Sequence, residues 1–146
     1  MKEYKVGIIG GTGMVGQRFI TLMENHPWFR LTVIAASARS AGKPYGEAAE
    51  KRWVMPSPIP ACARDLVVMD AVADAEKIAS LVDFCFCAVD MPKDEIRALE
   101  ERYARLECPI VSNNSAHRWT EDVPMVVPEI NPEQRSEVHW QIHRSM

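Results

Sequence analysis

The stretch that decides the fold is Lys5-Val6-Gly7-Ile8-Ile9-Gly10-Gly11-Thr12-Gly13-Met14-Val15-Gly16, residues 5–16. Its first five residues are a short, largely apolar run that ends in glycine, which is typical of a buried β-strand. The glycines that follow have the spacing Gly11-x-Gly13-x-x-Gly16 between a strand and a helix, where they let the backbone approach a pyrophosphate. We therefore predict a dinucleotide-binding turn, with the free N–H groups and positive end of the helix offsetting phosphate charge.

The rest of the chain continues this alternation of strands and helices. Apolar residues at helical spacing predict a first helix that buries Val15, Phe19, Leu22 and Met23. Further strands are predicted at 31–36, 66–69, 83–88, 109–111 and 125–127, and helices at 74–81, from Pro92 with the stripe Ile96, Leu99, Tyr103 and Leu106, and from 132 to 146. Residues 37–60 are expected to cross the surface irregularly, and residues 113–122 to form a loop. The pattern predicts the α/β class, a doubly wound and mostly parallel Rossmann-like sheet in one domain, residues 1–146.

Composition excludes several classes of protein. The 146 residues carry 17 Lys+Arg and 20 Asp+Glu, and 47% are hydrophobic, which excludes a disordered chain. The small negative charge lacks the basic surplus of nucleic-acid-binding proteins. Because no apolar run reaches the ~18–20 residues of a membrane span, we expect a cytoplasmic protein. Cys62, Cys85, Cys87 and Cys108 lack zinc-ligand spacing and are expected to be buried, reduced thiols.

The residues after the second strand indicate which dinucleotide binds. An Asp or Glu ~20 residues beyond the glycines would accept hydrogen bonds from a ribose 2′-hydroxyl, but the sequence has Ser37, Arg39, Ser40 and Lys43 there. Hydroxyl and cationic groups suit a 2′-phosphate, so we predict NADP(H) as the cofactor. The alternative is that Arg39 and Lys43 are solvated loop charges.

Taken together, these stretches resemble the aspartate-β-semialdehyde dehydrogenases, particularly the branch common in archaea and fungi. The matching segments, in the family's order, are 5–19, 35–43, Ser112-Asn113-Asn114-Ser115-Ala116-His117-Arg118, and 122–131, which contains Pro128-Glu129-Ile130-Asn131. The family usually has Ala where Gly11 stands. The combination of these loops is more specific than the glycine loop alone, which many enzymes share.

The resemblance implies NADPH-dependent reductive dephosphorylation of β-aspartyl phosphate to aspartate-β-semialdehyde, an early step towards lysine, threonine and methionine. It also implies site residues: Gly10, Thr12, Gly13, Met14 and Val15 at the pyrophosphate; Ser37, Arg39 and Ser40 at the 2′-phosphate; Ala88, Ser112 and Asn113 near the nicotinamide ribose; and Arg118 on the acyl phosphate of the substrate. The expected partners are this small-molecule substrate and further copies of the chain.

The family's catalytic cysteine and histidine match no position in this sequence, so no catalytic residue is assigned. We expect the chain to be the cofactor-binding part of the enzyme, to be inactive alone, and to self-associate through apolar surface that a second domain would cover. His139 and His143 share a helix face, but two ligands fall short of a metal site. Two alternatives remain: a related reductase acting on N-acetyl-γ-glutamyl phosphate or malonyl-CoA, with the former less favoured, or a stand-alone NADP-binding module.

Overall fold

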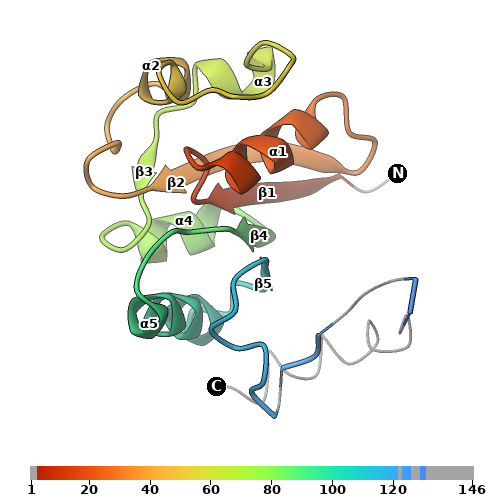
Figure 1. Ribbon diagram of the computed structural model, residues 1–146, viewed down its shortest axis with the longest axis vertical. Coiled ribbons are helices and arrows are strands. Elements are labelled where there is room, and N and C mark those ends of the chain that lie inside the picture. The colour runs from red at the N-terminus through yellow and green to blue at the C-terminus, as the bar shows by residue number, and fades with distance from the viewer. Residues whose placement is uncertain (1–2, 122, 126–128, 131–146) are drawn as a thin grey trace.

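A parallel sheet forms the centre of the molecule (Figure 1). The computed structural model describes residues 3–121, 123–125 and 129–130. Within them the strands are β1 (Tyr4–Ile9), β2 (Phe29–Ala36), β3 (Met69–Asp70), β4 (Phe84–Cys87) and β5 (Ile110–Ser112). Their order is β3-β2-β1-β4-β5, and each neighbouring pair is parallel. The chain thus moves outward from β1 to β3 and returns to the other side of β1, which makes the β1–β4 junction the topological switch point.

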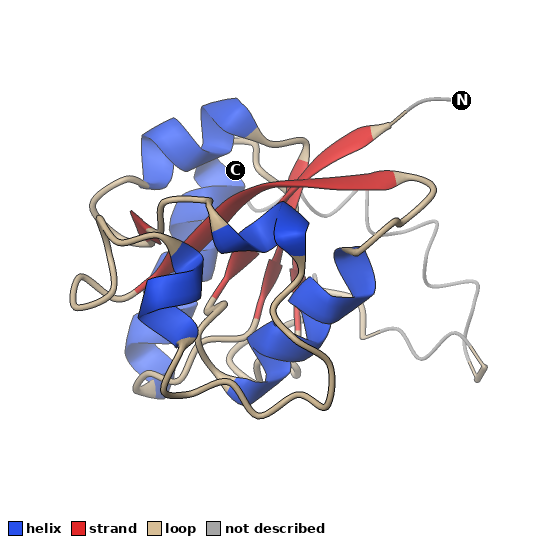
Figure 2. Cartoon of the chain, turned by 90° about the horizontal axis from the view of Figure 1, so that it is seen from above, coloured by secondary structure: helices blue, strands red, loops and turns tan. Residues whose placement is uncertain are grey.

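Helices cover both faces of this sheet (Figure 2). The helices are α1 (Met14–Met23), α2 (Tyr45–Ala49), α3 (Ala61–Arg64), α4 (Ala75–Leu81) and α5 (Lys93–Arg105). One buried cluster joins Val6 and Ile8 of β1 to residues of α1, α2 and α3, and the other joins Ile9 to residues of α4 and α5. The predicted doubly wound α/β fold is confirmed, because two helical layers bury the two faces of a parallel sheet.

The segment between β2 and β3 differs from its prediction. The expected strand at 66–69 is wrong in its bounds, because β3 is Met69–Asp70 and Val67 instead makes an isolated antiparallel bridge to Pro44. The expectation of an irregular surface crossing at 37–60 is also wrong, since the segment contains α2, whose Tyr45 and Ala49 are fully buried. Both differences arise from hydrogen bonds between parts of the chain that are far apart in the sequence, which a local pattern does not show.

The buried face of α1 also differs from its prediction. Met23 is buried as predicted and Phe19 is partly buried against the core, but Val15 is 41% and Leu22 is 50% exposed. Gly16, Gln17 and Ile20 are buried in addition. The helix turns this way because Gly16 lies against the turn that follows β1: a β-carbon there would be 2.1 Å from the carbonyl oxygen of Gly10. The prediction for α5 is confirmed, with Ile96, Leu99 and Tyr103 buried and Leu106, at the C-cap, partly buried against the same cluster.

Cys85, Cys87 and Cys108 are buried as predicted, but Cys62 is exposed, so the expectation is wrong for that residue. Residues 113–121 contain no helix or strand, as expected for a loop. In the predicted strand 125–127, Met125 is not in a strand and the other two residues lie outside the described part of the chain, as do the predicted helix 132–146, His139 and His143. No helix among the described residues is long and apolar enough to cross a membrane.

Candidate dinucleotide-binding site

The glycine loop begins at the switch point of the sheet. Gly10 has φ +88°, and a β-carbon on it would lie 2.2 Å from the carbonyl oxygen of Ala88, just after β4. The Gly10 N–H donates to Ala35 at 2.8 Å, and the Ala88 N–H donates to Ile9 at 2.9 Å. The backbone therefore follows a path that only glycine takes without strain, and it joins the ends of β1, β2 and β4.

The loop ends in an uncapped helix N-terminus. Gly13 is the N-cap of α1, no side chain caps the helix, and its first turn contains no acidic residue. Gly13, Met14 and Val15 are exposed. The first N–H groups of a helix have no partner within it and carry its positive partial charge. An anion such as a pyrophosphate is the complement of this end of α1.

Two buried side chains hydrogen-bond to the backbone of the glycine loop. The hydroxyl of Tyr45 donates to the carbonyl oxygen of Gly11 at 2.6 Å. The amide nitrogen of Gln17 donates to the carbonyl oxygens of Thr12 at 3.0 Å and Arg52 at 2.9 Å, while its oxygen accepts from Val54 N–H at 3.0 Å. Burial raises the pKa of Tyr45 above its ordinary value, so the hydroxyl remains a donor.

The environment of Gly11 accounts for glycine at a position where the resembled family has Ala. A β-carbon on Gly11 would lie 2.6 Å from Cγ2 of Ile34 and 3.2 Å from Cδ1 of Ile20. In this chain the space for that methyl group is therefore occupied by apolar side chains from β2 and α1.

The loop after β2 carries the predicted 2′-phosphate residues. The N–H groups of Ser40 and Ala41 donate to the Ser37 carbonyl at 3.0 and 3.2 Å, which turns the chain at the end of the strand. Arg39 and Ser40 line a cavity of about 410 Å³ between this loop and α2, whereas the structure places exposed Ser37 outside its lining. The charged groups of this cavity, called here the cationic cavity, are Arg39, Lys43, Lys51 and Arg52 with Glu47 and Glu50. Positive charge is in excess, which favours an anionic ligand.

A buried carboxylate organises the turn after β5. Glu100 of α5, 7% exposed, accepts hydrogen bonds from the Ser112 hydroxyl at 2.5 Å and the Asn114 amide at 3.0 Å. That amide also lies 3.3 Å from Sγ of Cys87, and Asn113 N–H donates to the Cys87 carbonyl at 2.9 Å. The Ser112 hydroxyl is thus engaged in shaping the turn, while the side chain of Asn113 is exposed.

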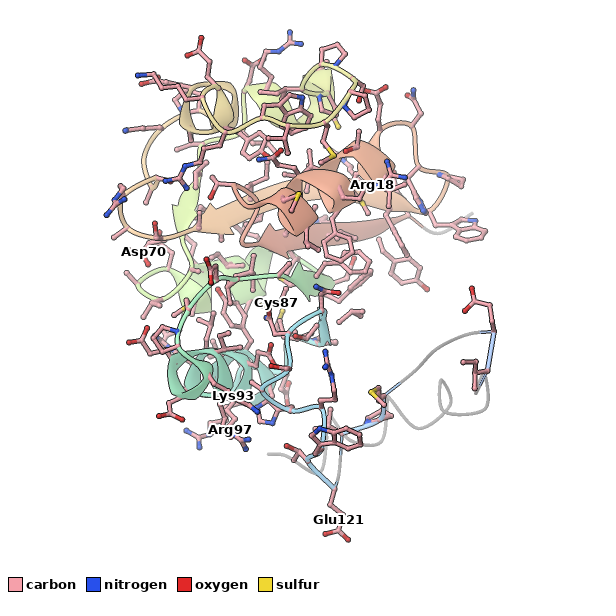
Figure 3. The ribbon with its side chains drawn as sticks, viewed as in Figure 1. Arg18, Asp70, Cys87, Lys93, Arg97 and Glu121 are labelled. Carbon is pink, nitrogen blue, oxygen red and sulfur yellow. The ribbon has the colours of Figure 1, made fainter. Side chains whose placement is uncertain are left out.

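Arg118 lies in the loop that follows this turn. Its side chain is exposed, and its N–H donates to the Ser115 carbonyl at 3.2 Å. Arg97 of α5 fastens the loop by donating to the Ala116 carbonyl at 2.8 Å, and His117 Nδ1 lies 3.1 Å from the Thr120 hydroxyl. Figure 3 shows Arg97 on α5 and Cys87 at the end of β4. Helix α5 therefore supports the loop that carries Arg118.

The parallel sheet brings most of the predicted residues to one edge. The glycine loop, the Ser37–Ser40 turn, Ala88 and the Ser112–Asn113 turn follow the carboxyl ends of β1, β2, β4 and β5 respectively. Parallel strands end at the same edge of a sheet, which is where open α/β sheets bind ligands.

Sequence reasoning gave no role to Gln17, Tyr45 or Glu100. Gln17 is a polar residue three positions before buried Ile20, and Glu100 lies between Ile96 and Tyr103 on the buried stripe of α5. For Glu100 a polar side chain on the predicted buried stripe was the available signal, since such groups need hydrogen-bond partners. Gln17 gave no such signal, because it lies off the stripe predicted for its helix. Tyr45 stands in a polar segment and gave no such signal.

The difference in exposure among the four cysteines leads to a testable prediction. Three are buried, and burial together with the nearby Glu100 charge raises the pKa of Cys87 to about 12. The hydrogen bond with Cys108, with burial second, raises the pKa of Cys85. Alkylation needs a thiolate that the reagent can reach. The hydrogen bond with Cys85 lowers the pKa of Cys108, but Cys108 is buried, whereas Cys62 is exposed, so we expect iodoacetamide at pH 8 to label Cys62 alone in the folded chain. Mass spectrometry should find one alkyl group per chain, rising to four in urea. Rapid labelling of Cys87 in the folded protein would contradict this.

Comparisons with known proteins agree with this geometry. Residues 5–138 match the family described as "Semialdehyde dehydrogenase, NAD binding domain". Aspartate-semialdehyde dehydrogenase from Methanothermobacter thermautotrophicus is 46% identical over 128 residues, covering 88% of this chain and 35% of that protein. Malonyl CoA reductase (NADP) from Metallosphaera sedula is 32% identical over 146 residues, covering 95% and 39%.

A solved structure is similar as well. Aspartate semialdehyde dehydrogenase with NADP from Candida albicans has a TM-score of 0.81 and 36% identity, covering 92% of this chain and 36% of that one. The resemblance seen in the sequence is confirmed. The chain spans about a third of the length of the relatives it matches, as the coverage of 35% and 36% shows.

Proposed function

The chain belongs to the family of semialdehyde dehydrogenase NAD-binding domains, and on this premise we propose that it binds NADP(H) as the cofactor-binding part of an acyl-phosphate reductase. The observation that carries the proposal is the uncapped glycine loop at the start of α1, which shares the sheet edge with the loop leading into the cationic cavity. These two features complement the pyrophosphate and the 2′-phosphate of NADP(H), respectively.

Each predicted residue has a place in this proposal. Gly10 and the backbone of Thr12, Gly13, Met14 and Val15 bind the pyrophosphate, and Arg39 with Ser37, Ser40 and Lys43 binds the 2′-phosphate. Ala88 and the turn of Ser112 and Asn113 lie beside the nicotinamide ribose. Arg118 holds the acyl phosphate, for which a planar guanidinium provides two parallel donors. The bound nicotinamide supplies or accepts the hydride.

For the whole enzyme we propose reduction of β-aspartyl phosphate to aspartate-β-semialdehyde. The aspartate-semialdehyde dehydrogenase relative, the more similar of the two named above, supports this substrate. A malonyl-CoA reductase is the second candidate, supported by the relative of that name. Comparing both acyl substrates with a protein that spans the full length of these relatives would separate them. A single domain of residues 1–146, self-association, inactivity of the chain alone and a cytoplasmic location remain predictions.

Isothermal titration calorimetry of the chain with NADPH and, separately, NADH tests the cofactor assignment. We expect NADPH to bind about tenfold more tightly or better, because a charge-assisted hydrogen bond contributes roughly 1.5–3 kcal/mol. Equal affinities would refute a 2′-phosphate site at the cationic cavity. Binding of neither cofactor would refute the proposal for this chain, and circular dichroism of the same sample establishes that it is folded.

A further inference from the structure

The glycine loop and the cationic cavity are joined by two buried side chains. Tyr45 belongs to α2, between Lys43 and Glu47 of the cavity, and its hydroxyl reaches the Gly11 carbonyl. Gln17 belongs to α1, and its amide nitrogen hydrogen-bonds to both Thr12 of the loop and Arg52 of the cavity. Its oxygen also accepts from Val54 N–H, so it fixes the backbone on both sides of Trp53.

The burial of these groups makes the connection stiff. Tyr45 is 0% and Gln17 is 1% exposed, and together they make four hydrogen bonds to backbone atoms. A buried carbonyl that loses its donor has no water to replace it. Movement of the segment 45–54 away from residues 11–12 would therefore leave the buried carbonyls of Gly11 and Thr12 without their side-chain donors.

We propose that Tyr45 and Gln17 are positioning residues that set the spacing between the pyrophosphate loop and the 2′-phosphate cavity. They thereby increase the preference for NADP(H) without touching it. This inference rests on the proposed function. A ligand that occupies two sites at once gains affinity over one that occupies a single site, and the gain depends on the separation of the two sites. NADP(H) spans both sites, NADH lacks the 2′-phosphate, and adenosine 2′-monophosphate lacks the pyrophosphate.

Tyr45→Phe is the principal test, because it removes one hydroxyl and keeps the buried ring. We expect NADPH to bind about three- to tenfold more weakly, the NADPH/NADH affinity ratio to fall, and adenosine 2′-monophosphate to change by less than about twofold. Calorimetric titrations of the three ligands into the same 146-residue chain supply the measurement. A purely stabilising role for the hydroxyl would leave that ratio unchanged.

Tyr103→Phe is the matched control. Tyr103 is also fully buried, and its hydroxyl donates to the Ala71 carbonyl at 2.8 Å from the helical layer on the other face of the sheet. We expect it to lower thermal stability like Tyr45→Phe while leaving the NADPH/NADH ratio intact. Gln17→Met, of similar shape but without its amide, should reproduce the Tyr45→Phe pattern. If it does not fold, Tyr45→Phe alone decides.

The outcomes separate this inference from the proposed function. If NADPH and adenosine 2′-monophosphate weaken equally in Tyr45→Phe, or neither weakens, the positioning role is overturned while the cofactor assignment stands. If the wild-type chain itself fails to prefer NADPH, the proposed function fails first. A fall of the NADPH/NADH ratio in Tyr103→Phe would also overturn the inference, since that hydroxyl does not join the two sites.

Discussion

Gly16→Ala should abolish cofactor binding and lower the free energy of unfolding by about 3 kcal/mol, the upper range for overpacking. The new β-carbon would lie 2.1 Å from the Gly10 carbonyl oxygen and 2.8 Å from the Cα of Gly11. These are backbone atoms in a turn pinned to β2, so they cannot step aside as a flexible side chain would. Helix α1 must therefore move away from β1, which opens the glycine loop that its N-terminus completes.

Gly13→Ala is the control for the predicted loss of stability. A β-carbon at Gly13 would be 3.7 Å from the nearest neighbour, an ordinary contact, and its φ of −79° suits any residue. Its cost is that of alanine at an N-cap, about 1 kcal/mol or less. Urea denaturation of both variants gives the comparison. Equal stability of Gly16→Ala and wild type would show that the helix and strand tolerate a wider separation than the structure gives them.

The fold was predictable because its signals are local. The apolar runs at β1, β2 and β4 and the helical stripe of α5 each lie within a short window, and the parallel sheet follows from their alternation. The glycine loop was predictable for the same reason. Features that depend on steric contacts with distant neighbours cannot be predicted from a short window. The buried face of α1 is one of them, because it depends on the packing of Gly16 against Gly10. Periodicity alone therefore assigned the exposed Val15 and Leu22 to the core.

The site was predictable only in outline. Parallel topology brings the turns after β1, β2, β4 and β5 to one edge, which anticipates where the ligand residues gather. The hydrogen-bond partners of the supporting residues were not predictable, because they lie far along the chain. Tyr45 and Gly11 are separated by 34 residues. The Ser112 hydroxyl donates to Glu100, since a buried carboxylate requires donors, and the sequence pattern does not show this contact.

Arg39→Ala should weaken NADPH binding by about ten- to a hundredfold while changing NADH binding by less than about threefold. The guanidinium lines the cationic cavity at the end of the turn after β2, where the sequence provides no acid for a ribose hydroxyl. A guanidinium–phosphate contact is charge-assisted and worth roughly 1.5–3 kcal/mol, and each 1.4 kcal/mol is tenfold in affinity. NADH lacks the phosphate, so it loses nothing comparable.

The neighbouring cations make this a demanding test. Lys43, Lys51 and Arg52 line the same cavity, and their field would survive the loss of Arg39. If the site acts only through net positive charge, Arg39→Ala and Lys51→Ala should weaken NADPH equally, and salt should weaken both variants alike. If Arg39 makes the directional contact proposed, its effect should exceed that of Lys51→Ala, and Arg39→Lys should restore only part of the affinity because an ammonium lacks the planar fork. Arg30→Ala is the remote control, since exposed Arg30 stands near the amino end of β2, at the edge opposite the site. If Arg39→Ala does not change the affinity for NADPH, the guanidinium of Arg39 is a solvated loop charge. The preference for NADPH would then depend on the other cations of the cavity.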